Sequence, residues 1–135
     1  MKKNILEYAR TNLITAPDDS NIQDIARIMK EELVGSVFLI DDSEKMLGIV
    51  TDKSIFDLIV EGKNPLEVKP IDIIEKIDTV HKNTSALEVL EKMKNKGYTR
   101  IGVSDDKGRL IGIVSRKKLQ FEQIRILKEE LGIQV

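Results

Sequence analysis

Apolar and polar positions alternate with two periods along the chain, and the same succession of periods occurs twice. Short apolar runs typical of strands surround residues 13–16 and 77–80. Each run is followed, after a polar turn, by apolar residues spaced three and four positions apart, which is the spacing of one helix face. The predicted faces consist of Ile22, Ile25, Ala26 and Met29 in the first half and of Ala86, Val89, Leu90 and Met93 in the second.

Paired β-branched runs follow each predicted helix and indicate a hairpin. The runs are 36–41 and 46–50 around a turn at 42–45, and 100–105 and 109–114 around a turn at 106–108. A further helix is expected after Thr51 and after Ser115, because a hydroxyl there can cap a helix by accepting a backbone N–H. The spacings Ser20-x-x-Gln23 and Ser85-x-x-Glu88 fit capping boxes at the start of the earlier two helices.

The succession of elements reflects an internal repeat. A shift of 64 residues places 13–57 over 77–121 without a gap, and nine of the 45 pairs are identical. The strongest match is Gly-Ile-Val-Thr at 48–51 over Gly-Ile-Val-Ser at 112–115. We therefore predict an α/β (α+β) fold with two β-α-β-β-α repeats, related by a pseudo-twofold axis and separated by a cleft.

Turn residues divide the chain further, since Gly62 and Pro65 end the first repeat and Pro70 marks a linker. The predicted segments are a helical N-terminal segment 1–12, a first repeat 13–62, a linker 63–76, a second repeat 77–122 and a helical extension 123–135. Residues 4–10 are expected to flank that extension, and Gly132 is expected to cap it. Its apolar residues pack within the chain or contact a second copy; they are Leu119, Ile124, Leu127 and Leu131.

The doubled pattern resembles a tandem pair of cystathionine-β-synthase-type (CBS) domains, the Bateman module. The resemblance covers about residues 12–122 and is carried by 13–17, Met29, 34–42 and 48–53, and by 79–80, Met93, 97–103 and 108–115. It implies an adenosine-containing ligand in the cleft between the repeats, a regulatory role and assembly as a homodimer. It also implies that an adenine lies along the first strand of each repeat, at Ile14, Thr15 and Ala16 or at Asp78, Thr79 and Val80.

The chain departs from the family at three positions. The resemblance places a ribose-binding Asp three residues after Thr51 and Ser115, where this sequence has Ser54 and Lys118. Ser54 still offers one hydroxyl, but an ammonium group such as that of Lys118 cannot accept a hydrogen bond from a ribose. The family's usual proline in the second hairpin is replaced by Gly102.

Charge is unevenly distributed, although the 22 Lys/Arg and 23 Asp/Glu leave a net charge of −1. Residues 1–72 carry a net charge of −5 and residues 73–135 a net charge of +4, which favours an anionic partner for the second half. Three cations, Arg116, Lys117 and Lys118, begin the last predicted helix, where they oppose the helix dipole. A bound phosphate, reached also by Arg100, would account for them; the alternative is a solvated basic face relieved by Glu122.

Several classes of site have few candidate residues. The chain has no cysteine and one histidine, His81, which we expect in an exposed turn without a role. Asp41, Asp42, Asp105 and Asp106 are hairpin-turn residues, and no metal site is expected from them. No apolar run approaches the roughly 20 residues that span a bilayer, and the N-terminus is not a signal peptide. We therefore expect a cytoplasmic protein without a membrane partner.

Three functions remain for such a chain. The first is a stand-alone, non-catalytic sensor with no cofactor that binds AMP, ADP, ATP, S-adenosylmethionine or a similar anion and signals to an unidentified regulated protein. The second is a structural interaction module with empty sites. The third is a nucleic-acid-binding protein that uses residues 92–118, with nine Lys/Arg against two Asp, although recognition motifs are missing. An enzyme is least supported, because no nucleophile–base pair or phosphate-binding glycine loop appears.

Overall fold

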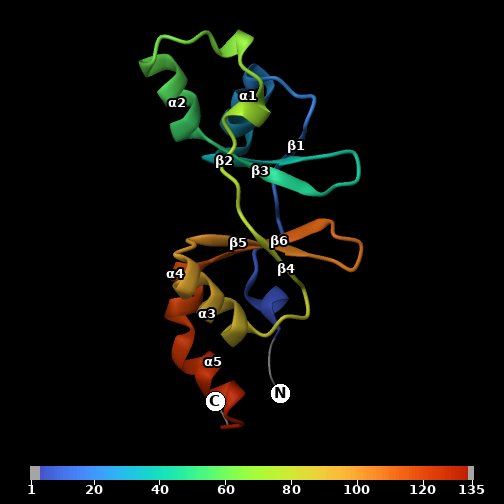
Figure 1. The fold of residues 1–135 in the computed structure, drawn as a ribbon, viewed down its shortest axis with the longest axis vertical. Coiled ribbons are helices and arrows are strands. Elements are labelled where there is room, and N and C mark those ends of the chain that lie inside the picture. The colour runs from blue at the N-terminus through green and yellow to red at the C-terminus, as the bar shows by residue number, and fades with distance from the viewer. Residues whose placement is uncertain (1–3, 134–135) are drawn as a thin grey trace. The chain divides into compact units, whose positions relative to one another are not determined.

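Two compact units make up the computed structural model, which describes residues 4–133 (Figure 1). The first-repeat unit is the continuous segment Leu13–Lys76. The second-repeat unit joins the segment that ends at Asn12 to the chain from Ile77 onward. Residues 1–3 of the predicted N-terminal segment and residues 134–135 of the predicted extension lie outside the described residues.

The first-repeat unit is a three-stranded sheet covered by two helices. Strand β1 (Thr15–Pro17) runs parallel to β2 (Ser36–Ile40), and β2 pairs antiparallel with β3 (Met46–Thr51). Helix α1 (Ile22–Glu32) follows β1 and helix α2 (Asp52–Val60) follows β3. Both helices lie on the same face of the sheet (Figure 1).

The second-repeat unit has the same order of elements, with one added helix. Its sheet has the order β4-β5-β6, again with one parallel and one antiparallel pair, and its helices lie on one face (Figure 1). The β-α-β-β-α order predicted for both repeats is therefore confirmed. The elements are β4 (Thr79–His81), α3 (Ala86–Lys96), β5 (Arg100–Ser104), β6 (Leu110–Ser115), α4 (Arg116–Phe121) and α5 (Gln123–Glu130).

Each unit has its own apolar core between the sheet and the helices. The predicted helix faces are buried there, except that Ala26 is partly exposed. Burying one large aliphatic side chain contributes about 1.5–3 kcal/mol, so these faces hold each helix on its sheet. The core residues shared by α1 and the strands are Ile22, Ile25, Met29, Val37, Leu39 and Val50, and those shared by α3 and the strands are Val89, Leu90, Met93, Ile101, Val103 and Val114.

The first turn of α1 corrects one prediction. Its N-cap is Asn21 and not Ser20: the Asn21 side chain accepts a hydrogen bond from the Asp24 N–H at 2.7 Å, and the Asn21 N–H donates to the Asp24 carboxylate at 3.3 Å. The predicted box was wrong by one residue because two good capping side chains stand in succession. In α3 the predicted cap is confirmed, since the Ser85 hydroxyl accepts from the Glu88 N–H at 3.2 Å.

The sheet of each unit is completed by a segment that precedes a repeat. In the second-repeat unit, Arg10 exchanges two backbone hydrogen bonds with Ile113 of β6, at 2.9 and 3.0 Å. In the first-repeat unit, Glu75 of the linker exchanges two with Ile49 of β3, at 2.8 and 2.9 Å. The segment before the first repeat thus closes the second-repeat sheet, and the segment before the second repeat closes the first-repeat sheet.

Short 3₁₀ helices lie in both of these segments. Ile5–Tyr8 forms one in the N-terminal segment, with Ile5 fully buried, and the linker contains Pro65–Glu67 and Pro70–Asp72. The Tyr8 hydroxyl donates to Glu129 of α5 at 3.3 Å, so the N-terminal segment flanks the C-terminal helix as predicted.

The C-terminal helix is interrupted at Glu122, where α4 ends and α5 begins. The four apolar residues expected to form one stripe therefore differ in environment: Leu119 is buried, whereas Ile124, Leu127 and Leu131 are exposed, and Ile126 fills the core instead. Gly132 follows α5 with φ 74°, the left-handed conformation expected of its capping glycine.

Candidate functional site

One end of the second-repeat sheet gathers the residues predicted to bind a ligand. Strands β4 and β5 begin at this end and β6 finishes there, because β4 and β5 are parallel and β6 is antiparallel. Arg100 stands opposite Ser115, and the Asp78 carbonyl accepts a hydrogen bond from the Gly102 N–H at 2.8 Å. Asp78, Arg100 and Ser115, from three separate parts of the sequence, therefore meet at one sheet end, beside Thr79.

The equivalent end of the first-repeat sheet gathers the other predicted residues. Thr51 at the end of β3 stands opposite Ser36, and the Ile14 carbonyl accepts from the Phe38 N–H at 2.9 Å. Thr15 begins β1 at the same end. Each unit thus presents its own set of predicted site residues.

The two predicted helix caps are confirmed. The Thr51 hydroxyl oxygen accepts from the Ser54 N–H at 3.1 Å and lies 2.9 Å from the Ser54 hydroxyl. The Ser115 hydroxyl oxygen accepts from the Lys118 N–H at 3.1 Å. A hydroxyl that accepts one hydrogen bond still has a proton to donate, so capping leaves Ser115 able to bind a second group.

Positive charge gathers at the second-repeat sheet end. Arg100 is exposed and forms no ion pair among residues 4–133, and Arg116 is half-buried. The Lys118 ammonium lies 3.7 Å from the Glu122 carboxylate, which also lies 3.6 Å from Arg125. Exposed ion pairs of this kind are worth about 0.2–1 kcal/mol, so Lys118 can exchange Glu122 for a ligand at little cost.

The corresponding helix start in the first-repeat unit has no such excess. Helix α2 begins with Asp52 where α4 begins with Arg116, and the Lys53 ammonium lies 3.2 Å from the Asp57 carboxylate. Positive charge therefore accumulates at the start of α4 and not at the start of α2.

Two predicted residues have side chains directed toward the core. Ala16 is fully buried in the first-repeat core, and Val80 packs against the second-repeat core. At these positions the backbone, and not the side chain, is the group that a ligand beside the strand would contact.

Two residues at the second-repeat sheet end were not identified from the sequence. The Tyr98 hydroxyl donates to the Asp78 carboxylate at 2.7 Å, and this hydrogen bond is the main cause that raises the pKa of Tyr98. The Lys92 ammonium lies 3.9 Å from the same carboxylate oxygen. Asp78 is 20 residues from Tyr98 in the sequence, so helix or strand spacing gives no signal for this contact.

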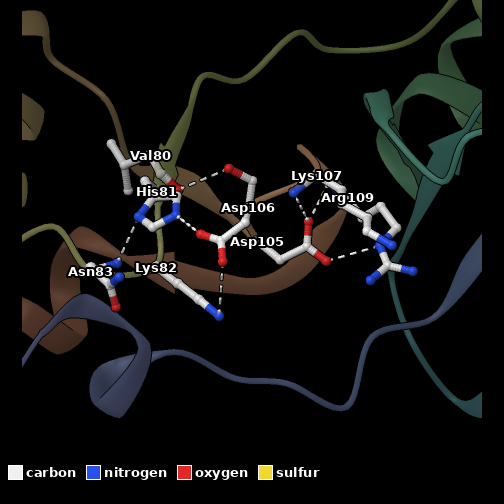
Figure 2. A network of polar contacts seen from close by, with 9 residues as sticks. Val80, His81, Lys82, Asn83, Asp105, Asp106, Lys107 and Arg109 are labelled. Atoms are coloured by element: carbon white, nitrogen blue, oxygen red, sulfur yellow. Dashed lines mark hydrogen bonds and ion pairs between the residues drawn. The ribbon is translucent and has the colours of Figure 1, made fainter.

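His81 lies at the opposite end of the sheet, in a polar network shown in Figure 2. It is the last residue of β4, and its carbonyl oxygen accepts from the Thr84 N–H at 3.0 Å, so it also begins the turn that follows; its side chain is exposed, as predicted. Its Nδ1 accepts from the Asn83 N–H at 3.2 Å, so Nε2 carries the proton that is shared with Asp106 Oδ1 at 2.6 Å. The Lys82 ammonium lies 4.0 Å from the other Asp106 oxygen.

Asp105 organises the neighbouring hairpin turn (Figure 2). Its Oδ1 accepts the N–H groups of Lys107 and Arg109, both at 2.9 Å, and its Oδ2 accepts from Arg109 Nε at 2.8 Å. The pKa of Asp105 is lowered, chiefly by the hydrogen bond from the Arg109 backbone. These bonds stabilise the β5–β6 turn, and the His81–Asp106 contact joins this turn to the end of β4. The role of the network is therefore structural.

Residues 4–133 contain neither a cluster of metal-ligating side chains nor a helix that could span a membrane. No three His, Cys, Asp or Glu side chains come together as metal ligands in this part of the chain. No helix within it combines the length and the apolar character needed to cross a membrane.

Comparison with known proteins gives the family. A family model described as the CBS domain matches residues 5–61 and 68–122. The uncharacterized protein MK0525 of Methanopyrus kandleri is 33% identical over 130 residues, which are 93% of this chain and 66% of that protein.

Solved structures are similar in fold. The CBS domain pair of protein MJ0100, in complex with 5′-methylthioadenosine and S-adenosyl-L-methionine, matches with a TM-score of 0.69 at 21% identity, over 96% of this chain and 99% of that one. The cytosolic domain of the Mg²⁺ channel MgtE, in complex with ATP, matches with a TM-score of 0.73 at 18% identity, over 88% of this chain and 48% of that one. This chain therefore belongs to the CBS domain family and carries two CBS domains in tandem.

Proposed function

We propose that this CBS pair is a regulatory sensor that binds an adenosine-containing nucleotide, or a similar anion, at the second-repeat sheet end. The observation that carries the proposal is that Arg100, Ser115 and Lys118 lie at this sheet end, where the Asp78 carboxylate is already bound by Tyr98 and Lys92 and the Glu122 carboxylate lies beside Lys118. Related folds crystallised with ATP or with S-adenosyl-L-methionine support this class of ligand.

The replacement of the ribose-binding carboxylate by Lys118 determines the expected preference. Phosphate contacts should dominate over ribose contacts, because an ammonium attracts phosphate and cannot accept from a ribose hydroxyl. Affinity should rise from AMP to ADP to ATP, and adenosine should bind poorly. Binding should weaken with salt, since exposed charges are screened over about 8 Å at physiological ionic strength.

Calorimetry with AMP, ADP, ATP, adenosine and S-adenosylmethionine tests the proposal. Lys118→Ala should lower ATP affinity roughly 10- to 150-fold, since a charged hydrogen bond contributes about 1.5–3 kcal/mol. Lys117→Ala is the matched control, because it removes an exposed cation from the same helical turn that is not assigned to the ligand. Lys118→Asp should move the preference toward adenosine and AMP. Equal affinities in the wild type, Lys118→Ala and Lys117→Ala would remove Lys118 from the site.

The second candidate is an interaction module with empty sites. The observation in its favour is that the side chains at the two positions where the family has an Asp already have partners. The Lys118 ammonium pairs with the Glu122 carboxylate, and the Ser54 hydroxyl forms a hydrogen bond with the Thr51 hydroxyl. This function becomes the better account if no ligand of the panel binds at millimolar concentration.

The proposal includes a homodimer, a signalling partner that is an unidentified regulated protein, and a binding role in place of a catalytic one. Exposed apolar residues on α2 and α5, such as Ile59 and Ile124, support a dimer contact. The near-neutral net charge of −1 does not favour nucleic acid as the partner. The cytoplasmic location stays a prediction from the sequence.

A further inference from the structure

A groove in the first-repeat unit lies away from the residues predicted to bind a ligand. It has a volume of about 470 Å³. One wall is the turn between β1 and α1, residues 18–21, and the other is the linker segment 66–71, which runs beside α1 (Figure 1). Strand β1 begins at the predicted ligand end of the sheet and the turn follows its last residue, so the groove lies at the other end. We call it the linker groove.

The second-repeat unit shows how the equivalent turn is covered. There the turn before α3 pairs with the N-terminal segment: the Ile5 N–H donates to the Thr84 carbonyl at 2.8 Å, and Asn4 forms an antiparallel bridge with Ser85. The backbone of Asn4 is extended, and the Ile5 side chain is fully buried. In the repeat where this turn has a partner, the partner is therefore an extended segment with an apolar anchor residue.

The corresponding contact is missing from the first repeat within the described residues. Ser20 is equivalent to Thr84 by the shift of 64 residues. Pro70 is equivalent to Ile5, because each begins a 3₁₀ helix five residues before the residue that pairs with the sheet. Proline has no N–H to donate, and the Ser20 carbonyl accepts no hydrogen bond from any of residues 4–133. Ser20, a residue of the groove wall, thus keeps an unused backbone acceptor.

The charges of the linker groove favour a basic occupant. Asp18, Asp19 and Glu67 line it against one cation, Lys69. None of the three carboxylates forms an ion pair within residues 4–133. The unit as a whole carries 7 Lys/Arg against 14 Asp/Glu, a net charge of −7. Complementary charge steers association and excludes partners of like charge, so an acidic segment is disfavoured and a basic one is favoured.

Apolar side chains stand between these charges. Leu66 and Ile71, both on the linker wall of the groove, are 69% and 45% exposed. Large exposed apolar side chains that lie close together usually mark a contact with another molecule. They provide a surface for the apolar anchor of a bound segment.

We infer that the linker groove binds a short extended segment of the regulated protein, in which an apolar anchor residue follows lysine or arginine. The N–H of the anchor donates to the Ser20 carbonyl, and its side chain packs against Leu66 and Ile71. The preceding cations approach Asp18 and Asp19. Backbone pairing of this kind supplies affinity, and the side chains supply specificity. The inference rests on the proposed signalling partner and adds the chemistry of the segment that this partner presents.

The sequence of the N-terminal segment supplies a probe. The peptide Lys-Lys-Asn-Ile-Leu, with the sequence of residues 2–6, has two cations before the asparagine and isoleucine that pair with the equivalent turn in the second repeat. It is blocked at both ends and titrated into the full-length, ¹⁵N-labelled protein, and heteronuclear NMR follows the backbone amides. Saturable shifts should occur in 18–21 and in 66–71, whereas the amides of Thr84 and Ser85 should not move.

Two matched peptides and two protein variants separate the contributions. Glu-Glu-Asn-Ile-Leu should bind about 10-fold more weakly, because its charges are reversed. Lys-Lys-Asn-Pro-Leu lacks the anchor N–H and should bind roughly 2- to 12-fold more weakly, the range expected for one hydrogen bond. Asp19→Lys should weaken binding of the first peptide about 5- to 10-fold. Asp42→Lys is the control, because it makes the same charge change at an exposed residue of the same unit outside the groove.

Any of the following results would overturn the inference. They are no shift in either groove wall at millimolar peptide, equal affinity of the three peptides, or equal losses in Asp19→Lys and Asp42→Lys. Shifts at Thr84 and Ser85 would show that the peptide replaces the N-terminal segment on the second-repeat unit instead. Groove shifts that grow with protein concentration in the absence of peptide would show that a second copy fills the groove. In each case the calorimetric titration with nucleotides would still report on the sensor function.

Discussion

At the scale of single residues, Gly48 and Gly112 occupy equivalent strand positions but have different surroundings. A Cβ on Gly48 would lie 2.8 Å from the Glu75 carbonyl oxygen and 2.9 Å from the Ile74 side chain. A Cβ on Gly112 would lie 3.0 Å from the Ala9 Cβ and 3.5 Å from the nearest backbone atom. Each glycine therefore allows a flanking segment to approach the sheet, and the approach is closer at Gly48.

We expect Gly48→Ala to destabilise the protein by about 1–3 kcal/mol, the usual range for overpacking. Gly112→Ala should cost less, because its nearest neighbour is a side chain on a short terminal segment. Urea denaturation followed by circular dichroism measures both. Equal losses of stability in the two variants would contradict the difference in the space available for a Cβ at the two glycines.

Tyr8 gives a prediction for alkaline pH. Burial, with the Glu129 carboxylate as the next cause, raises the pKa of Tyr8 from 10.0 to about 12. The folded state therefore retains the phenol proton longer than the unfolded state, so this contribution is present below pH 10 and is lost as the pH rises toward 12.

The wild type should consequently lose more stability between pH 9 and pH 11 than Tyr8→Phe, because phenylalanine has no proton to release. The difference in the free energy of unfolding should be of the size that proton linkage gives for one phenol. Urea midpoints at a series of pH values provide the comparison. Parallel curves for the two proteins would count against this assignment.

The candidate site could be predicted in part from its residues. Thr51 and Ser115 were identifiable as caps, because capping depends on neighbours three positions away. The contact of Tyr98 with Asp78 joins different elements, and the partner of His81 depends on how a hairpin turn folds back. Contacts of this kind have no periodic signal in one sequence.

At the scale of elements, the predicted helices and strands agree with the structure to within about two residues at most ends, as expected where periodicity is strong. The exchange of flanking segments could not be predicted in the same way. The pairs Arg10 with Ile113 and Glu75 with Ile49 use backbone groups, and backbone groups are the same in every residue except proline.

The N-terminal segment should contribute strongly to the stability of the second-repeat unit. Ile5 is fully buried, and its N–H donates to the Thr84 carbonyl at 2.8 Å. Ile5→Ala should cost about 2–5 kcal/mol, as expected for truncation of a buried aliphatic side chain. Leu33→Ala, at a side chain that is 90% exposed, is the control and should cost little.

Hydrogen exchange measures where that loss occurs. In Ile5→Ala, protection should fall in α3, β6 and α5, and it should fall less in β2 and β3. A uniform loss over both units, or no loss, would contradict the docking of this segment on the second-repeat unit.

At the scale of the whole molecule, the units carry net charges of −7 and +6. If the proposed homodimer brings units of opposite charge together, their attraction must respond to salt, because the screening length falls from about 10 Å at 0.1 M to about 3 Å at 1 M. The dimer Kd should therefore rise about 10-fold between 50 and 500 mM NaCl, a tenfold change being about 1.4 kcal/mol. Sedimentation velocity measures it, and a Kd that falls or stays constant would indicate a purely apolar contact.

The discontinuous second-repeat unit has a consequence for synthesis on the ribosome. Its first segment ends at Asn12, and the rest of the unit begins at Ile77, after the whole first-repeat unit. At about 5–20 residues per second, Ile113 is made roughly 5–20 s after Arg10, its partner in the sheet. During that interval the first-repeat unit can complete its own sheet through Glu75. The core in which Ile5 and Tyr8 are buried has not yet been synthesised. The acidic first-repeat unit can thus fold first, and the segment that ends at Asn12 joins the second-repeat unit in a later step.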